Sequence, residues 1–94
     1  MAPEDQAAAD FMQKYLDTCQ HGSFEEYAKL VYFPNTAVYV QQQELFYPSV
    51  HDPAAMDSWR RINDKLWAFA ILYDGIAAPN YLFVGELDGA LKVI

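Results

Sequence analysis

The residues of this chain that could carry acid–base chemistry are few, and they lie far apart in the sequence. Tyr15 occupies an apolar position of a helical pattern, where its hydroxyl would be satisfied in the core or would donate into a pocket. His51 and Asp57 could complete an acid–base pair, so one alternative function is a small lyase or isomerase acting on a hydrophobic carbonyl compound. Sequence spacing alone does not orient side chains, so no catalytic set is assigned.

The sequence shows no pattern typical of a metal or cofactor site. His21 and His51 are 30 positions apart, and Cys19 falls on an apolar helical face, where a small core residue is expected. These residues lack the ligand spacing of a zinc site. The four glycines are isolated, so they cannot form a phosphate-binding loop. We therefore expect neither metal nor cofactor.

The charge balance narrows the range of partners. Thirteen acidic residues against six basic ones give a formal net charge of −7. Nucleic acids and anionic membranes are bound through clustered Lys and Arg, so neither is expected. The acidity fits solubility, or an acidic inhibitor or immunity-type protein that binds a basic target. The single cysteine, the acidic N-terminus and the lack of an apolar run of about 18 residues predict a soluble, cytoplasmic protein.

The first third of the chain predicts two amphipathic helices. Pro3 favours a helix start, and apolar residues then recur every three or four positions to about Gln20. Ser23 and Glu26 have the spacing of a capping box, which would begin a short second helix. That helix must end before Pro34.

The middle of the chain is predicted to form two strands and a third helix. Residues 36–40 are largely β-branched or aromatic, which favours a strand, and residues 45–47 form a weaker one. Asp52-Pro53 is a typical helix start. The buried stripe of this helix would contain Met56, Trp59, Ile62 and Leu66. Ion pairs four residues apart would lie on its exposed side, Asp57 to Arg61 and Arg60 to Asp64.

The last third of the chain predicts antiparallel strands. Residues 67–73 are continuously apolar and read as a buried strand. Strands 81–87 and 90–94 flank Asp88-Gly89, a strong signal for a tight hairpin. The whole chain, residues 1–94, is thus expected to be one α+β domain. Two N-terminal helices and a third helix would pack on a curved, mainly antiparallel sheet of about five strands.

The final hairpin is predicted to be apolar on both faces. Leu82, Val84, Leu91 and Val93 would share one face. The opposite face would carry Tyr81, Phe83 and Ile94, together with Gly85 and Lys92. Helices can cover only one face, so the other requires a ligand, a second subunit or a partner protein.

Two segments give the chain a resemblance to a known superfamily. Residues 11–27 and 83–94 resemble the opening helices and closing hairpin of the nuclear-transport-factor-two-like superfamily, which includes ketosteroid isomerase and polyketide-cyclase-like enzymes. The resemblance implies a cone-shaped fold with an apolar pocket, often in a homodimer, and places Tyr15 where isomerase-type members have an oxyanion donor. Tyr39 or Val40 stands where those members need a carboxylate base, so that mechanism is not carried over. Leu91 stands where tryptophan is common in the family.

These observations favour binding over catalysis. We expect a small non-catalytic module that forms a homodimer or binds a protein partner through Tyr81, Phe83 and Ile94. A small apolar ligand pocket is expected near Tyr15, Tyr39 and Trp67.

Overall fold

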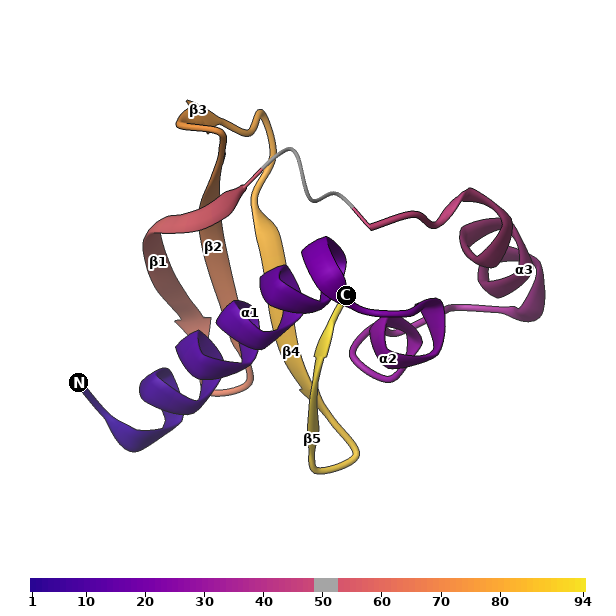
Figure 1. Ribbon diagram of the computed structural model, residues 1–94. Coiled ribbons are helices and arrows are strands. Elements are labelled where there is room, and N and C mark those ends of the chain that lie inside the picture. The colour runs from indigo at the N-terminus through magenta and orange to yellow at the C-terminus, as the bar shows by residue number, and fades with distance from the viewer. Residues whose placement is uncertain (49–52) are drawn as a thin grey trace.

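The computed structural model describes residues 1–48 and 53–94, and within them the chain has an α+β fold (Figure 1). The helices are α1 (Pro3–His21), α2 (Phe24–Ala28) and α3 (Thr36–Leu45). The strands are β1 (Ala54–Asn63), β2 (Leu66–Tyr73), β3 (Ile76–Ala77), β4 (Leu82–Leu87) and β5 (Ala90–Val93). Neighbouring strands pair antiparallel in one curved sheet. The predicted fold class is confirmed.

The first two helices form where local signals place them. Pro3 lies in the first turn of α1, and Glu4 and Asp5 put negative charge at the positive end of the helix dipole. The face of α1 toward the sheet carries the buried residues Ala8, Ala9, Met12 and Leu16. The Ser23 side chain accepts the backbone N–H of Glu26, whose carboxylate in turn accepts the N–H of Ser23, each at 3.2 Å. The predicted capping box is therefore confirmed.

The sheet has the strand order β1-β2-β4-β5, and β3 pairs with β2. Two tight turns set its register. Asp74-Gly75 and Asp88-Gly89 have positive φ at both central residues, as the hairpin turns that match strand twist require. Val31, after α2, adds a parallel bridge to Val93 on the free edge of β5.

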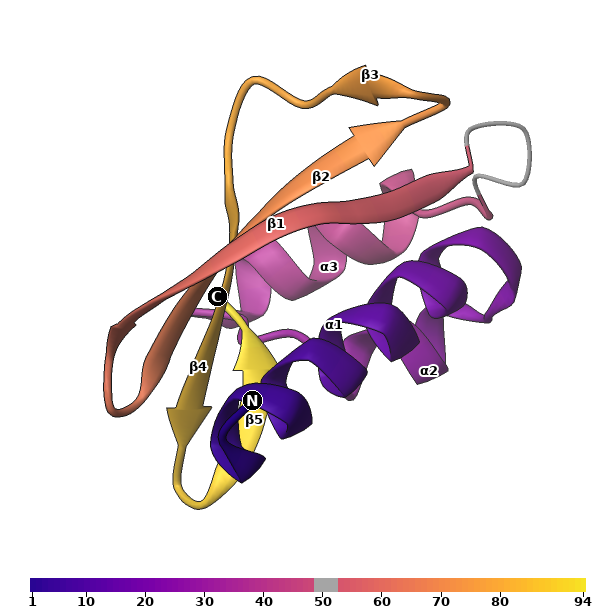
Figure 2. The same cartoon turned by 90° about the vertical axis from the view of Figure 1, so that its left-hand side faces the viewer.

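The hydrophobic core lies between α1 and the inner face of the sheet, which is the face that α1 covers. Its largest fully buried side chains include Met12, Leu16, Trp67 and Phe69. Val84 and Val93 are also in this core, and Leu82 and Leu91 pack against it, as the hairpin pattern predicted. Figure 2 shows α1 beside the sheet, and among the described residues no helix covers the opposite face.

Residues 36–40, predicted as a strand, belong to α3, so that prediction is wrong. The Asn35 side chain accepts the N–H of Val38 at 3.0 Å and caps the helix. β-Branching disfavours a helix only weakly, and this cap offsets part of the penalty. The weaker strand predicted at 45–47 is also wrong, because Leu45 ends α3 and no strand follows at once.

The predicted third helix, from Pro53 to Leu66, is also wrong, because most of this segment forms β1. A bulge between Met56 and Ser58 breaks the two-residue alternation of this strand. Met56 and Trp59 consequently share a face although they are three positions apart, which imitates a helical spacing. The strand forms because the apolar β2 binds β1 along one edge and β4 along the other. The proposed N-cap Asp52 lies outside the described residues.

The ion pairs predicted on that helix, Asp57 to Arg61 and Arg60 to Asp64, need helical geometry. Residues four apart on a strand are about 13 Å from each other, which is too far for an ion pair. Arg61 instead pairs with Asp5 of α1, with 3.6 Å between Nη1 and Oδ1.

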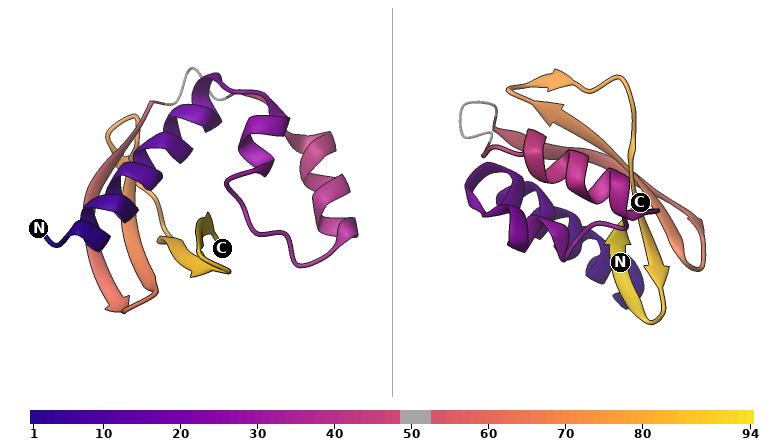
Figure 3. Two further views of the ribbon diagram at one scale, coloured as in Figure 1. Left: turned by 90° about the horizontal axis from the view of Figure 1, so that it is seen from below. Right: turned by 90° about the vertical axis from the view of Figure 1, so that its right-hand side faces the viewer.

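The helix α3 lies away from β1 and β2 (Figures 1 and 3). The ring of Tyr39 is 5.2 Å from that of Phe24 and 5.2 Å from that of Phe33. The third helix is therefore attached to the α2 region by aromatic contacts, and it has no buried residue of its own.

Candidate association face

The face of the sheet opposite α1 is here called the outer face. Strand register assigns its residues, because directly paired residues point to the same side. They are Ala55, Ser58, Arg60, Asn63, Leu66, Ala68, Ala70, Leu72, Phe83, Gly85, Leu87, Ala90 and Lys92. On β2 the small residues Ala68 and Ala70 lie between Leu66 and Leu72, whereas β4 carries a large aromatic side chain.

The three residues predicted to form an interface lie together on this face. Tyr81, Phe83 and Ile94 are 58%, 37% and 49% exposed. The rings of Tyr81 and Phe83 are 6.5 Å apart and meet edge to face. The N–H of Ile94 donates to the carbonyl of Phe83 at 3.0 Å, and a Cβ at Gly85 would lie 3.1 Å from Ile94 Cδ1. They form an exposed apolar ridge, which we call the β4 ridge.

Two hollows flank the β4 ridge. The smaller, of about 220 Å³, is lined by Ala68, Ser58 and Arg60 and is bounded by Tyr81. The larger, of about 790 Å³, runs between the hairpin and the 31–33 segment and shares Ile94 with the ridge. Its apolar lining also includes Tyr32, Phe33 and Leu87. Sequence reasoning missed Tyr32 and Leu87, because their place depends on the Val31–Val93 bridge rather than on a local pattern.

Charge is distributed unevenly over this face. None of the outer-face positions that strand pairing assigns is acidic, and the exposed Asp57 lies beside Ser58 in the bulge of β1, where it has no paired residue. Arg60 lies on β1 at one edge of the sheet. Glu86 and Asp88 line the larger hollow near the opposite edge, and Glu86 pairs with Leu91 on the side of the sheet toward α1. Lys92 also lines this hollow, and its ammonium donates to the carbonyl of Lys29.

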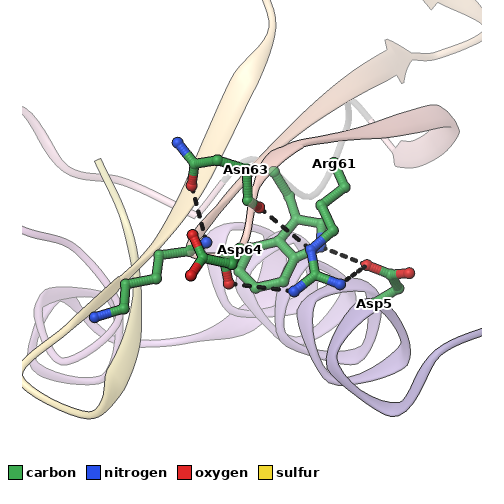
Figure 4. A network of polar contacts seen from close by, with 6 residues as sticks. Asp5, Arg61, Asn63 and Asp64 are labelled. Carbon is green, nitrogen blue, oxygen red and sulfur yellow. Dashed lines mark hydrogen bonds and ion pairs between the residues drawn. The ribbon is translucent and has the colours of Figure 1, made fainter.

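Trp67, predicted for a ligand pocket, is a structural residue. Its indole Nε1–H donates to Asp5 Oδ1 at 2.9 Å, and its side chain is almost fully buried. The Arg61 guanidinium carbon lies 5.4 Å from the Trp67 ring centroid, so the cation stacks on the ring (Figure 4). Arg61 also donates to the carbonyls of Asn63 and Asp64 at 3.2 and 3.3 Å. The network fixes the start of α1 to the β1–β2 turn.

Tyr15 lies in a different part of the structure. Its ring is 5.9 Å from that of Tyr27, and its hydroxyl is hydrogen-bonded to Cys19. Burial raises the pKa of Tyr15 far above the ordinary value, and Cys19 and Tyr27 raise it further. Its phenol is therefore a neutral hydrogen-bonding group near neutral pH.

Tyr15, Tyr39 and Trp67 are not brought into one pocket. Trp67 binds Asp5, ten residues before Tyr15 on α1, and ten helical residues span about 15 Å. Tyr39 contacts the rings of Phe24 and Phe33 instead.

The alternative catalytic set is only partly located. Asp57 is exposed on β1, at the bulge, whereas His51 lies outside the described residues. Residues 1–48 and 53–94 contain no group of three His, Cys, Asp or Glu side chains that could hold a metal ion. None of the helices in these ranges is long and apolar enough to cross a membrane.

Comparisons with known proteins add no relative to this picture. No family model, no curated protein and no solved structure matches the chain.

Proposed function

We propose that this protein acts by non-covalent association, with the outer face binding the surface of another protein subunit. The observation that carries the proposal is the β4 ridge. Tyr81, Phe83 and Ile94 lie together and exposed, on a sheet face that no described helix covers. A contiguous apolar patch of this kind is typical of an interaction site rather than of a solvated surface.

The chemistry of the face supports association over catalysis. It offers aromatic and aliphatic contact area with few charges, as the centre of a protein interface does. Of the side chains considered for acid–base chemistry, Tyr15 is on α1, away from this face, Asp57 is exposed at the bulge of β1, and His51 lies outside the described residues.

A relationship to the nuclear-transport-factor-two-like superfamily belongs to the same proposal. Its support is the order of a long helix, a short capped helix and a final antiparallel hairpin. It is also supported by the Val31–Val93 bridge, which places a short extended segment directly after the second helix.

Site-specific photo-crosslinking tests the association. Benzoylphenylalanine replaces Phe83 in one variant and Tyr47 in a control, because Tyr47 is 75% exposed and lies beyond α3, away from the outer face. Each variant is irradiated alone and in native extract. We expect defined protein adducts, with self or with another chain, from position 83 only. Identical adduct patterns from both positions, or none from position 83, would overturn the proposal.

A further inference from the structure

The strand β1 has one edge that no described strand covers. It is ten residues long, pairs with β2 along one side and ends the sheet on the other, at the left in Figure 1. An unpaired strand edge presents backbone N–H and C=O groups that a strand of another chain can bind. We call this side of β1 the free edge.

The hydrogen bonds of the sheet determine which residues direct their backbone groups to the free edge. The N–H of Asp74 donates to the carbonyl of Pro53 at 2.8 Å, so this pair bonds across β2 and β1. Hydrogen-bonded and non-hydrogen-bonded pairs alternate along an antiparallel ladder. The residues in the non-hydrogen-bonded pairs with β2 therefore point their backbone groups outward, and they are Ala54, Met56, Trp59 and Arg61. None of the backbone hydrogen bonds outside the ladders, within 1–48 and 53–94, involves these four.

The bulge of β1 gives this row of outward groups a spacing that matches itself. Asp57 is the extra residue of the bulge, so successive outward residues are separated by two, three and two positions. A regular strand presents such groups at every second position and can follow this row on only one side of the bulge. An antiparallel second copy presents two, three and two positions in reverse, which is the same spacing. The free edge is therefore complementary to itself.

We propose that the free edge of β1 pairs antiparallel with the free edge of a second copy of this chain, around a two-fold axis that passes between Asp57 and Ser58. Met56 of each copy then lies opposite Trp59 of the other. The pairing is isologous, because the same residues serve on both sides of the axis. It joins two sheets into one and leaves the outer face of each copy open, so it is a second interaction surface beyond the association function proposed above.

The apolar side chains along the free edge fit this register. Trp59 is 37% exposed although strand pairing places it on the face toward α1, and Met56 on the same face is only partly buried. Aromatic and aliphatic side chains that lie opposite each other on paired strands stabilise the pairing. The contact between Met56 and Trp59 forms twice in the dimer and removes exposed indole surface from water.

The charges near the axis fit the same register. Asp57 and Arg60 are both exposed, and neither belongs to an ion pair among the described residues. Asp57 of one copy lies opposite Ser58 of the other, and Arg60 is two positions further along that strand. This diagonal position is within reach of a long side chain, so each Asp57 carboxylate gains a guanidinium from the other copy.

Sedimentation velocity of the purified full chain, from low micromolar to millimolar concentration, tests the pairing. We expect a reversible monomer–dimer equilibrium. Trp59→Pro removes an outward N–H, and proline is tolerated on an edge strand where that N–H does not join the ladder. The variant should weaken the dimer about tenfold or more relative to Trp59→Ala, which loses the same ring and keeps the N–H. Circular dichroism verifies that both variants are folded.

Single cysteine substitutions test the axis without the proline variant. Ser58→Cys places two thiols diagonally across the axis, with Cα atoms about 6 Å apart, which a disulfide can span. Ala55→Cys is the matched control, because Ala55 is also a small exposed residue on the outer face of β1. Its two copies would lie about 17 Å apart. Under mild oxidation, Ser58→Cys should give at least about tenfold more disulfide-linked dimer than Ala55→Cys.

The outcomes separate this inference from the association function of the outer face. A chain that stays monomeric at millimolar concentration and gives no linked dimer through Ser58→Cys overturns the pairing, whereas specific adducts from position 83 would still support the association function. A dimer that Trp59→Pro weakens no more than Trp59→Ala overturns it too, because such a dimer uses another surface. Equal linking through both cysteine positions contradicts the proposed axis. If Trp59→Pro does not fold, the two cysteine variants decide.

Discussion

The half of the molecule built from α1 and the sheet differs in kind from the half built from α2 and α3. Between α1 and the sheet, Met12, Trp67 and Phe69 are enclosed by two layers, and strand register fixes their positions. The helix α3 has no buried residue and is held by contacts of Tyr39 with the rings of Phe24 and Phe33. Both halves are rich in apolar residues, but the largest fully buried side chains lie between α1 and the sheet, whereas Phe24 is the buried residue of α2.

This difference predicts unequal local stability. Burying one large apolar side chain contributes about 1.5–3 kcal/mol, whereas a ring–ring contact adds about 0.5–1.5 kcal/mol beyond burial. We therefore expect α1 and the sheet to unfold as one cooperative unit. The α2–α3 half should open locally at a lower free energy.

The largest expected effect comes from a core truncation. Phe69→Ala removes a fully buried ring from β2 and should lower the free energy of unfolding by about 3–5 kcal/mol. Urea denaturation followed by circular dichroism measures the change. The matched variant Phe33→Ala, in the aromatic cluster, should lower it by about 1 kcal/mol or less. Equal losses of free energy of unfolding in the two variants would show that the two halves contribute equally to stability.

An intermediate effect is expected from the polar network in Figure 4. Asp5→Ala leaves the buried indole N–H of Trp67 without its acceptor and removes the pairing with Arg61. The free energy of unfolding should fall by about 1–3 kcal/mol, mainly because an unsatisfied buried donor is costly. Asp10→Ala, on the exposed side of the same helix, is the control and should change it by less than about 0.5 kcal/mol. If Asp5→Ala lowered the free energy of unfolding no more than the control does, the network would not contribute to the stability of the fold.

A smaller and local effect is expected at α3. Tyr39→Ala removes the ring contacts with Phe24 and Phe33 that hold α3 against the α2 region. Amide hydrogen exchange should accelerate in α3 by several-fold, while the amides of β2 keep their protection. Equal acceleration of amide exchange in α3 and β2 would show that the two halves of the molecule unfold as one cooperative unit.

The elements that local chemistry specifies were predictable from the sequence. The Ser23–Glu26 capping box and the Asp88-Gly89 turn are set by a few neighbouring residues, and each lies where the sequence predicts it. The alternation in the last hairpin also predicted that Tyr81, Phe83 and Ile94 would share an exposed side.

What the sequence did not predict depends on distant partners. The bulge beside Asp57 gives Met56 and Trp59 of β1 the spacing of a helix, and only the pairing of this segment with β2 shows that it is a strand. The role of Trp67 depends on Asp5, which is 62 positions away. No local sequence pattern predicts a contact over this distance. The sequence therefore favours a pocket position for Trp67, whereas the structure buries its side chain against α1.

The smallest effect concerns the boundary between the two halves, where Tyr15 on α1 contacts Tyr27 on α2 and is hydrogen-bonded to Cys19. Burial raises the pKa of the Cys19 thiol above its ordinary 9.0 and raises the pKa of Tyr15 above its ordinary 10.0. Above pH 9 the unfolded chain thus releases protons that the folded chain retains. The free energy of unfolding should consequently fall as the pH rises through and above 9.

Urea titrations at successive pH values measure this slope, and a variant assigns it to the boundary. Tyr15→Phe removes one of the groups whose pKa is raised, which also include Tyr27 and Tyr73, so its stability should fall less steeply above pH 9.5 than that of the original chain. Tyr47→Phe makes the same chemical change at an exposed position away from this boundary and serves as the control. If the free energy of unfolding of Tyr15→Phe fell with pH as steeply as that of the original chain, the hydroxyl of Tyr15 would have to be open to solvent. The contact between Tyr15 and Tyr27 would then not connect the two halves of the molecule.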